Sequence, residues 1–273
     1  MKDIGFGHGG RIVSALEDKE WSGLLRLGGF SLLGAGLTLA LSVLVSLLET
    51  TTITTTQVET VIGTPPAGLT NVTGFSFALS ILPNSTFGTN AQYVSAHAML
   101  FETYFLLSAL FFAFLIPGVL ALYIALRGKG RAPASVGLAL AVSGIFLGFM
   151  YVPSAFSTIR MLQLYASATS DAARSGFFGA ALASDDILNV GSIMSSLLLS
   201  GALIIVGYLM TKDTRFGKNM GYLGIFAGLV NVATSFLPYP LSIAGSFLSV
   251  FGLVWILISG MRLIKLPRRM TQE

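Results

Sequence analysis

A stretch of one hundred residues, 27–126, contains no lysine and no arginine. It holds two long apolar segments separated by a Thr-rich segment, and basic residues flank it on both sides. A helix needs roughly 20 apolar residues to cross the hydrocarbon core of a bilayer, and Lys and Arg are retained preferentially in cytoplasmic segments. The stretch therefore predicts two membrane helices joined by a loop outside the cell.

Four further segments are apolar and long enough to cross a membrane. Hydrophobic residues make up 53% of the chain and charged residues only 10%, whereas about a quarter of the residues in soluble proteins are charged. We therefore predict an all-α, polytopic membrane helix bundle that forms one domain, residues 1–273. The six predicted transmembrane spans are 24–48, 101–126, 134–156, 187–210, 219–237 and 241–263.

The distribution of lysine and arginine orients these spans. With the N-terminus in the cytoplasm, all 16 basic residues except Arg160 and Arg174 fall in cytoplasmic segments. We therefore predict a multi-pass protein of the cell membrane with both termini in the cytoplasm and outside loops at 49–98 and 157–186. The basic residues then face anionic headgroups, so the basic isoelectric point calls for no nucleic-acid partner.

The first outside loop, of about fifty residues, carries two kinds of local signal. The first span is expected to end at Glu49, and the Thr-rich run 50–57 that follows has β character. Sequons begin at Asn71 and Asn84, so both are candidates for N-glycosylation in an organism that glycosylates its surface proteins.

The second outside loop, 157–186, contains apolar residues at roughly helical spacing. We predict two short helices lying over the outer end of the bundle, with Ser170 or Asp171 as the N-cap of the second. The adjacent acids Asp185 and Asp186 are expected to cap the span that begins at residue 187, because negative charge stabilises a helix N-terminus.

Glycines in two spans predict close helix packing. Gly144 and Gly148 form a GxxxG pair in the third span, and Gly224 and Gly228 have the same spacing in the fifth. Small residues of this kind let two membrane helices approach closely. The sequence leaves open whether these faces pack within the bundle or against another subunit.

Two features lie near the middle of the predicted spans. Pro117 interrupts the backbone hydrogen bonding of the second span and predicts a kink. The fourth span carries a polar stripe that we expect to hydrogen-bond to neighbouring helices rather than to a substrate. The stripe consists of Asn189, Ser192, Ser195, Ser196 and Ser200.

The chain has few side chains suited to catalysis or cofactor binding. It contains no cysteine, which excludes disulfides, thiolate ligands and cysteine nucleophiles. The two histidines, His8 and His97, fall on opposite sides of the membrane in the predicted topology and so cannot share a haem or a metal ion. We expect an outer polar cluster of His97, Glu102 and Arg160, and we expect no enzyme activity, no cofactor and no metal.

Several short motifs in the second half carry a family resemblance. They are the segment QLYASAT at 163–169, Arg174, the loop Arg215-Phe216-Gly217-Lys218, and MGYLGIFAG at 220–228. In these motifs, and best over residues 153–266, the chain resembles a large family of six-helix prokaryotic membrane proteins known as a domain of unknown function. The Thr-rich loop looks longer than that family's first outside loop. The resemblance implies the six-helix topology and no particular activity.

Two classes of function remain open. Spans almost free of charge and many small-residue faces favour a non-catalytic accessory or structural subunit of a larger membrane complex. Its partners would be membrane lipids and other membrane proteins, and in an archaeal cell a respiratory complex would be a natural host. The alternative is a transporter or binder of a small neutral or apolar molecule, with a polar cavity near Ser195, Ser196 and Pro117.

Overall fold

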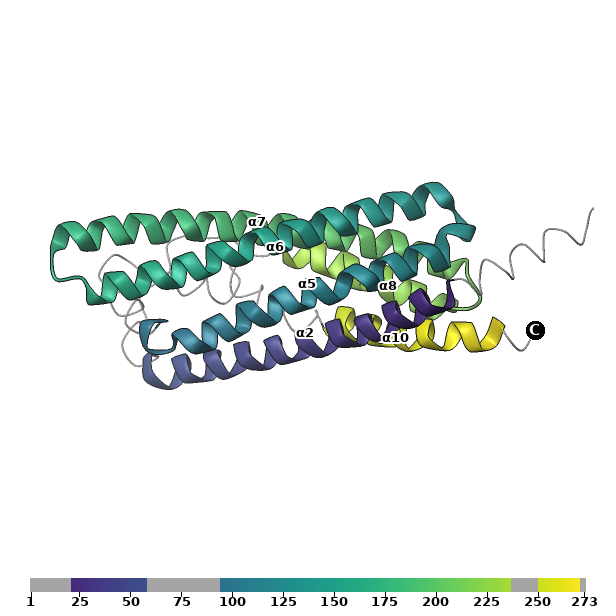
Figure 1. Ribbon diagram of the computed structural model, residues 1–273, viewed down its shortest axis with the longest axis horizontal. Coiled ribbons are helices and arrows are strands. Elements are labelled where there is room, and N and C mark those ends of the chain that lie inside the picture. Colours follow the sequence, from purple (N-terminus) through teal and green to yellow (C-terminus); the bar gives the residue numbers. More distant parts are fainter. Residues whose placement is uncertain (1–20, 58–93, 237–249, 271–273) are drawn as a thin grey trace, which may run out of the picture.

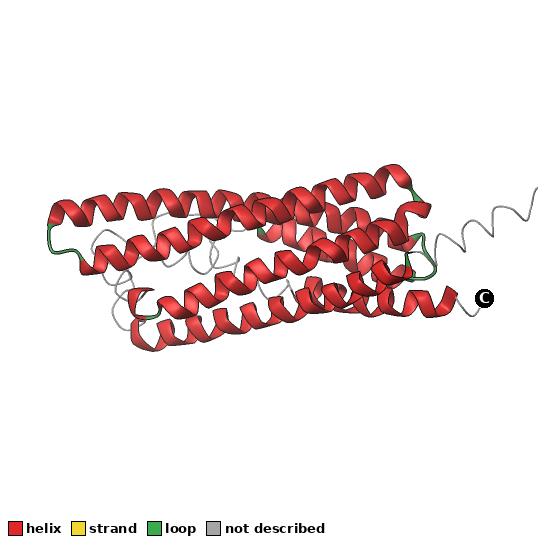
Figure 2. Ribbon diagram, in the orientation of Figure 1, coloured by secondary structure: helices red, strands yellow, loops and turns green. Residues whose placement is uncertain are grey.

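The computed structural model describes residues 21–57, 94–236 and 250–270, and every regular element in these ranges is a helix (Figure 1; Figure 2). The long helices run along one common axis. The helices are α2 (Ser22–Gln57), α5 (Ala98–Leu126), the short 3-10 helix η1 (Arg127–Lys129), α6 (Arg131–Ser167), α7 (Asp171–Thr211), α8 (Lys218–Thr234) and α10 (Val250–Met270).

Five helical segments of the described chain are long and apolar enough to cross a membrane, which confirms the predicted all-α membrane fold. They are Ser22–Val45, Ala98–Lys129, Arg131–Ser167, Asp171–Thr211 and Val250–Pro267. The remaining helix, α8, has 17 residues. At about 1.5 Å per residue it is slightly shorter than the roughly 30 Å hydrocarbon core. The prediction of six spans therefore stays a prediction.

The helices form a ring in chain order. Each packs mainly against its neighbours along the chain, and α10 closes the ring by packing against both α8 and α2. The beginning of α2, the α5–α6 turn, the α7–α8 loop and the end of α10 lie at one end of the bundle (Figure 1). We call this the basic end, because the basic residues of these segments gather there. The α6–α7 turn lies at the opposite end.

The α6–α7 hairpin is longer than predicted. The apolar residues assigned to a separate short helix, such as Ile159 and Leu162, are buried in the same interface as Val152 and Ala155. Helix formation is cooperative, so this continuous apolar stripe extends the two spanning helices. The prediction of two short helices over 157–186 is therefore wrong.

The turn between α6 and α7 confirms one local prediction. The backbone leaves the helical region at Ala168, and Ser170 is the N-cap of α7. The Ser170 hydroxyl accepts a hydrogen bond of 3.3 Å from the backbone N–H of Ala173. This satisfies one of the N–H groups that a helix start leaves without a partner.

The end of α2 also differs from the sequence-based expectation. The helix does not end at Glu49 but continues to Gln57, through the Thr-rich run that was predicted to have β character. β-Propensity depends strongly on context. Here the run continues a long helix that has already nucleated and that packs beside α5.

Two apolar clusters form the core. The larger one lies toward the basic end and joins all six long helices through residues such as Leu32, Leu122 and Trp255. The second lies toward the opposite end and joins only α5, α6, α7 and Val94. Large apolar side chains such as Phe30, Phe146 and Leu229 are exposed on the outside of the bundle, as expected for a lipid-facing surface.

Candidate functional site

The serine stripe of α7 forms hydrogen bonds inside the bundle. Ser195 is buried, and its hydroxyl donates a hydrogen bond of 2.7 Å to the carbonyl oxygen of Gly144 on α6. The Ser200 hydroxyl donates to the carbonyl oxygen of Ser196, one turn earlier, at 2.6 Å. The prediction that this stripe hydrogen-bonds to a neighbouring helix is confirmed at Ser195.

Asn231 on α8 completes a polar network with this stripe. Its amide Nδ2 donates to the hydroxyls of Ser196 at 3.0 Å and Ser200 at 2.7 Å. The hydroxyls of Ser196 and Ser235 lie 3.3 Å apart. The sequence analysis did not single out Asn231, although an amide in the middle of an apolar segment was a usable signal. In lipid such contacts stabilise helix association by about 0.6 kcal/mol each.

Pro117 packs against α2. Helix α5 runs through this proline, and a Cβ atom on Gly28 would lie 2.7 Å from the Pro117 carbonyl oxygen. A hollow beside α5, lined by described residues, is apolar and wide enough for about one water molecule. The hollow is lined by Val119, Leu122, Tyr123, Leu126, Ala134, Gly137, Leu138, Val206 and Leu209. It touches neither Pro117 nor the serine stripe.

The four predicted packing glycines all contact helices of the same chain. A Cβ atom on Gly144 would lie 2.8 Å from Leu199 Cγ, and one on Gly228 would lie 2.7 Å from Ile204 Cγ1. A Cβ on Gly148 would overlap the ring of Phe112, and one on Gly224 would lie 2.5 Å from Trp255 Nε1. The alternatives left open by the sequence are therefore resolved in favour of packing within the bundle. The interfaces are α6–α7, α5–α6, α7–α8 and α8–α10.

The predicted outer polar cluster lies at the end opposite the basic end. His97 precedes α5, and Glu102 is half-buried in the first turns of that helix. Arg160 on α6 is exposed, and its Nη1 is 3.5 Å from Gln163 Oε1. The ion pairs between described residues are Arg174–Asp171 and Arg215–Asp213, so the structure does not join Glu102 to Arg160.

Asp185 is a buried carboxyl in the interior of α7. Because α7 begins at Asp171, Asp185 and Asp186 do not cap a helix, and that prediction is wrong. Asp185 is 5% exposed, and its Oδ2 accepts a hydrogen bond of 3.1 Å from Asn189 Nδ2. Its Oδ1 is buried with no hydrogen-bond donor among the described residues. A charge in such surroundings is destabilising, so the site favours a neutral side chain.

A second buried carboxyl, Asp213, lies in the α7–α8 loop and is fully paired. Arg215 donates from Nη2 at 2.7 Å and from Nε at 3.0 Å, and its backbone N–H donates at 2.9 Å. Burial by itself would raise the pKa of Asp213, but these hydrogen bonds and the Arg215 charge outweigh it and hold the pKa below its usual range. Arg215 Nη2 also donates to the carbonyl oxygen of Ala125 at 2.5 Å, which fastens the loop to the end of α5.

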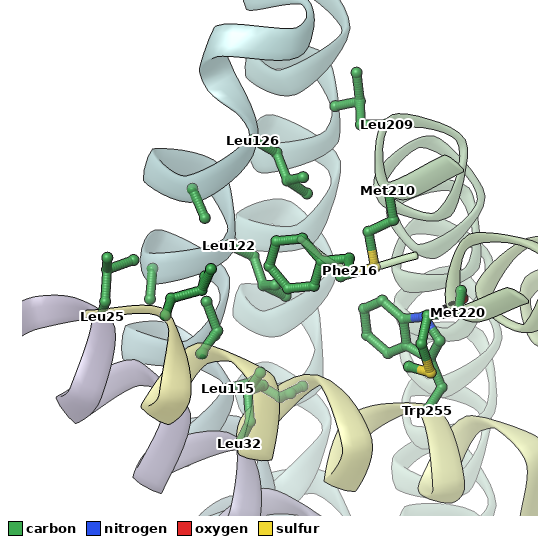
Figure 3. Packing of buried hydrophobic residues seen from close by; sticks show 14 of the residues in the cluster. Leu25, Leu32, Leu115, Leu122, Leu126, Leu209, Met210, Phe216, Met220 and Trp255 are labelled. Atoms are coloured by element: carbon green, nitrogen blue, oxygen red, sulfur yellow. Dashed lines mark hydrogen bonds between the residues drawn. The ribbon is translucent and has the colours of Figure 1, made fainter. Parts of the chain in front are cut away.

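The same loop inserts an aromatic ring into the core. Phe216 is fully buried, and Figure 3 shows its ring between Leu122 and Met210. Gly217 follows with φ of +75°, a conformation that favours glycine, and it is the N-cap of α8. The motif Asp213-Thr-Arg-Phe-Gly therefore closes the bundle at its basic end. Sequence reasoning used Arg215 as a topology signal and as part of the family motif, and it did not consider Asp213.

The chain matches no family model, no curated protein and no solved structure. The resemblance to the six-helix family therefore stays a prediction. Asn71 and Asn84, the glycosylation candidates, and His8 lie outside the described residues.

The chemistry of the described residues is that of a helix-packing site. No group of three His, Asp or Glu side chains able to hold a metal ion occurs in the described ranges. The hydroxyl and amide groups of α7 and α8 bond to one another, and the Asp213 carboxylate bonds to Arg215. These contacts fix the relative positions of the helices.

Proposed function

We propose that this protein is a non-catalytic scaffold, an accessory subunit that presents the α6–α7 hairpin to other proteins of a membrane complex. The length of this hairpin carries the proposal. Its helices have 37 and 41 residues, which at about 1.5 Å per residue is close to twice the roughly 30 Å hydrocarbon core. The end that carries the α6–α7 turn must therefore project well beyond the lipid.

The composition of the projecting part supports a contact role. The first turns of α7 expose Ala172, Gly176, Gly179 and Ala180, and a Cβ atom added to either glycine would meet nothing within 4 Å. Small, weakly charged surfaces of this kind let a second helix approach closely. The interhelical bonds of Ser195 and Asn231 argue against the transporter alternative, because they occupy the polar groups that would have lined its cavity.

The proposed topology has six spans, with α8 as the fifth and both termini in the cytoplasm. The basic end then faces the cytoplasm and the hairpin faces outward, because Lys and Arg are retained inside. This arrangement suits the plasma membrane of a prokaryote and agrees with the six-helix family that the second half resembles. An archaeal respiratory complex is one such host, and the sequons of the first outside loop would carry glycans there.

The test is purification from native membranes in mild detergent, followed by native mass spectrometry. The proposal expects a stoichiometric partner chain with the wild type. Gly176→Glu, on the projecting hairpin, should lose that partner. Gly128→Glu is the matched control at the basic end, because Gly128 is equally open. A lone monomer or homo-oligomer in the wild type would overturn the subunit role, and a retained small molecule would favour the transporter alternative.

A further inference from the structure

The described part of the basic end holds a group of cations with almost no accompanying acid. Basic residues come from the start of α2, the α5–α6 turn, the α7–α8 loop and the end of α10, which lie together there (Figure 1). The described acid at this end is Asp213, which is 1% exposed. Its carboxylate is already paired with Arg215 at 2.7 Å. Among the residues that the structure describes, this end therefore carries an excess of positive charge.

Four of these cations are brought together by the α7–α8 loop. Arg215 fixes the loop to the end of α5, so Lys212 and Lys218, which flank the loop, lie at the same end as Lys129. Lys129 is close enough to act electrostatically on Asp213. Arg262 reaches the loop from α10, and its Nη1 would lie 3.2 Å from a Cβ on Gly217.

None of these four side chains forms an ion pair with a described acid. The ion pairs between described residues involve only Arg174, Asp171, Arg215 and Asp213. Lys212 instead places its Nζ 4.2 Å from the centre of the Tyr208 ring. A lysine beside a tyrosine at the end of an apolar helix is typical of the headgroup level of a bilayer.

We propose that Lys129, Lys212, Lys218 and Arg262 form a preorganised platform that binds the headgroup phosphates of anionic phospholipids. Retention of basic residues in the cytoplasm explains where they lie, but it requires no binding. The anchored loop favours binding for two reasons. It holds cations from three segments at the same end, and its Arg215 neutralises the nearby Asp213 carboxylate.

A lipid fits this platform better than a soluble anion. The side chain of Tyr222 is 60% exposed on α8, one helical turn after Lys218. A phospholipid can place its chains against this side of the helix while its phosphate contacts the cations. Each lysine or arginine near an anionic surface favours binding by roughly fivefold, so four together give a marked preference for anionic over zwitterionic lipid.

The two tryptophans allow a direct test with the full chain in vesicles. Trp21 is 36% exposed at the basic end and lies 5.8 Å from the Arg127 guanidinium, whereas Trp255 is 4% exposed. Vesicles of phosphatidylcholine and phosphatidylglycerol are prepared with bromine on one lipid or the other. Quenching of Trp21 then reports which lipid lies at the basic end of the bundle, which carries the platform. The wild type should select phosphatidylglycerol several-fold, and more weakly as salt is raised.

Variants identify the residues responsible. The triple variant K129Q/K212Q/K218Q should bring the lipid selectivity close to unity, and Arg262→Gln should lower it partly. The control R160Q/R174Q removes cations from the opposite end and should leave the selectivity unchanged. Unaltered Trp255 emission shows that each variant is folded.

Three results would overturn the inference. The first is equal quenching by both lipids in the wild type, and the second is full selectivity in the triple variant. The third is displacement of the lipid by millimolar inorganic phosphate, which would show a site for a free anion. The inference does not rest on the subunit role, since lipid selectivity can be present whether or not a partner chain copurifies.

Discussion

Gly207 on α7 and Gly221 on α8 face each other so closely that neither position has room for a side chain. A Cβ atom on Gly207 would lie 2.7 Å from the Gly221 carbonyl oxygen, and one on Gly221 would lie 2.6 Å from that of Gly207. Gly29 and Gly260 repeat this reciprocal contact between α2 and α10, at 2.8 Å in both directions. The ring of helices is therefore closed by direct backbone contact at these seams.

The first prediction tests the contact between Gly207 and Gly221. Gly207→Ala should destabilise the protein by about 1–3 kcal/mol, because the added methyl group would force two backbones apart. Gly176→Ala is the matched control in the same helix, since a Cβ there meets nothing within 4 Å. Thermal unfolding in mild detergent should show a lower midpoint for Gly207→Ala alone. Equal midpoints for the two variants would mean that the seam can relax.

The two buried carboxyls of the described residues, Asp185 and Asp213, should respond differently to the same substitution. Asp185→Asn replaces a group whose Oδ1 has no described donor, so the variant should be as stable as the wild type or more stable. Asp213→Asn breaks charged hydrogen bonds with Arg215 and should lower stability by about 1–3 kcal/mol. Thermal midpoints of the two variants, measured side by side, check both directions. A large loss with Asp185→Asn would contradict the reasoning.

Asp213 should also make the protein sensitive to acid. Its pKa is lowered in the folded state, so its contribution to stability is fully present above the unfolded-state pKa of about 3.9. That contribution is lost as the pH falls through the lower folded pKa. Stability measured from pH 6 down to pH 3 should therefore fall less steeply in Asp213→Asn than in the wild type. Parallel curves would show that the ion pair is not the acid-sensitive contact.

Loss of the polar network between α7 and α8 should lower stability by less than the substitutions at Gly207 and Asp213. Asn231→Leu should lower stability by about 0.6–1.7 kcal/mol, the range for hydrogen bonds between membrane helices. Asn219→Leu on the same helix is the control, because Asn219 is exposed. If Asn231→Leu is neutral, the amide contributes nothing beyond its packing.

The sequence predicts the membrane fold well because the bilayer imposes a simple requirement. A segment without enough apolar residues cannot cross the bilayer. The spans that the structure shows as helices could therefore be predicted by counting consecutive apolar residues. Ser170 was also predictable, because its capping interaction involves residues within the same turn. Features that depend on neighbouring residues, such as the length of an apolar segment or a helix cap, can therefore be predicted from the sequence.

The partners across helices were not predictable in the same way. Gly144 could be assigned to a contact face, but the sequence does not show how α6 is aligned along α7. Its contact with Leu199 could therefore not be predicted. The long α6–α7 hairpin was missed because its outer half lacks the uniform apolar character of a span, although Ile159 and Leu162 continue the buried stripe. The pairing of Asp213 with Arg215 was missed because topology rules treat basic residues as signals and give acids little weight.

The last prediction tests the proposed topology by cysteine labelling. The sequence contains no cysteine, so only an introduced cysteine would be labelled. Single cysteines at Ser175 and Thr214 lie at opposite ends of the bundle, and both positions are exposed. In intact cells a membrane-impermeant maleimide should label Ser175→Cys, because the proposed topology places the α6–α7 turn outside the cell. Thr214→Cys should be labelled only after the cells are opened, because the proposed topology places the α7–α8 loop at the cytoplasmic leaflet. The reverse pattern would place the basic end outside, contrary to the retention of Lys and Arg in the cytoplasm.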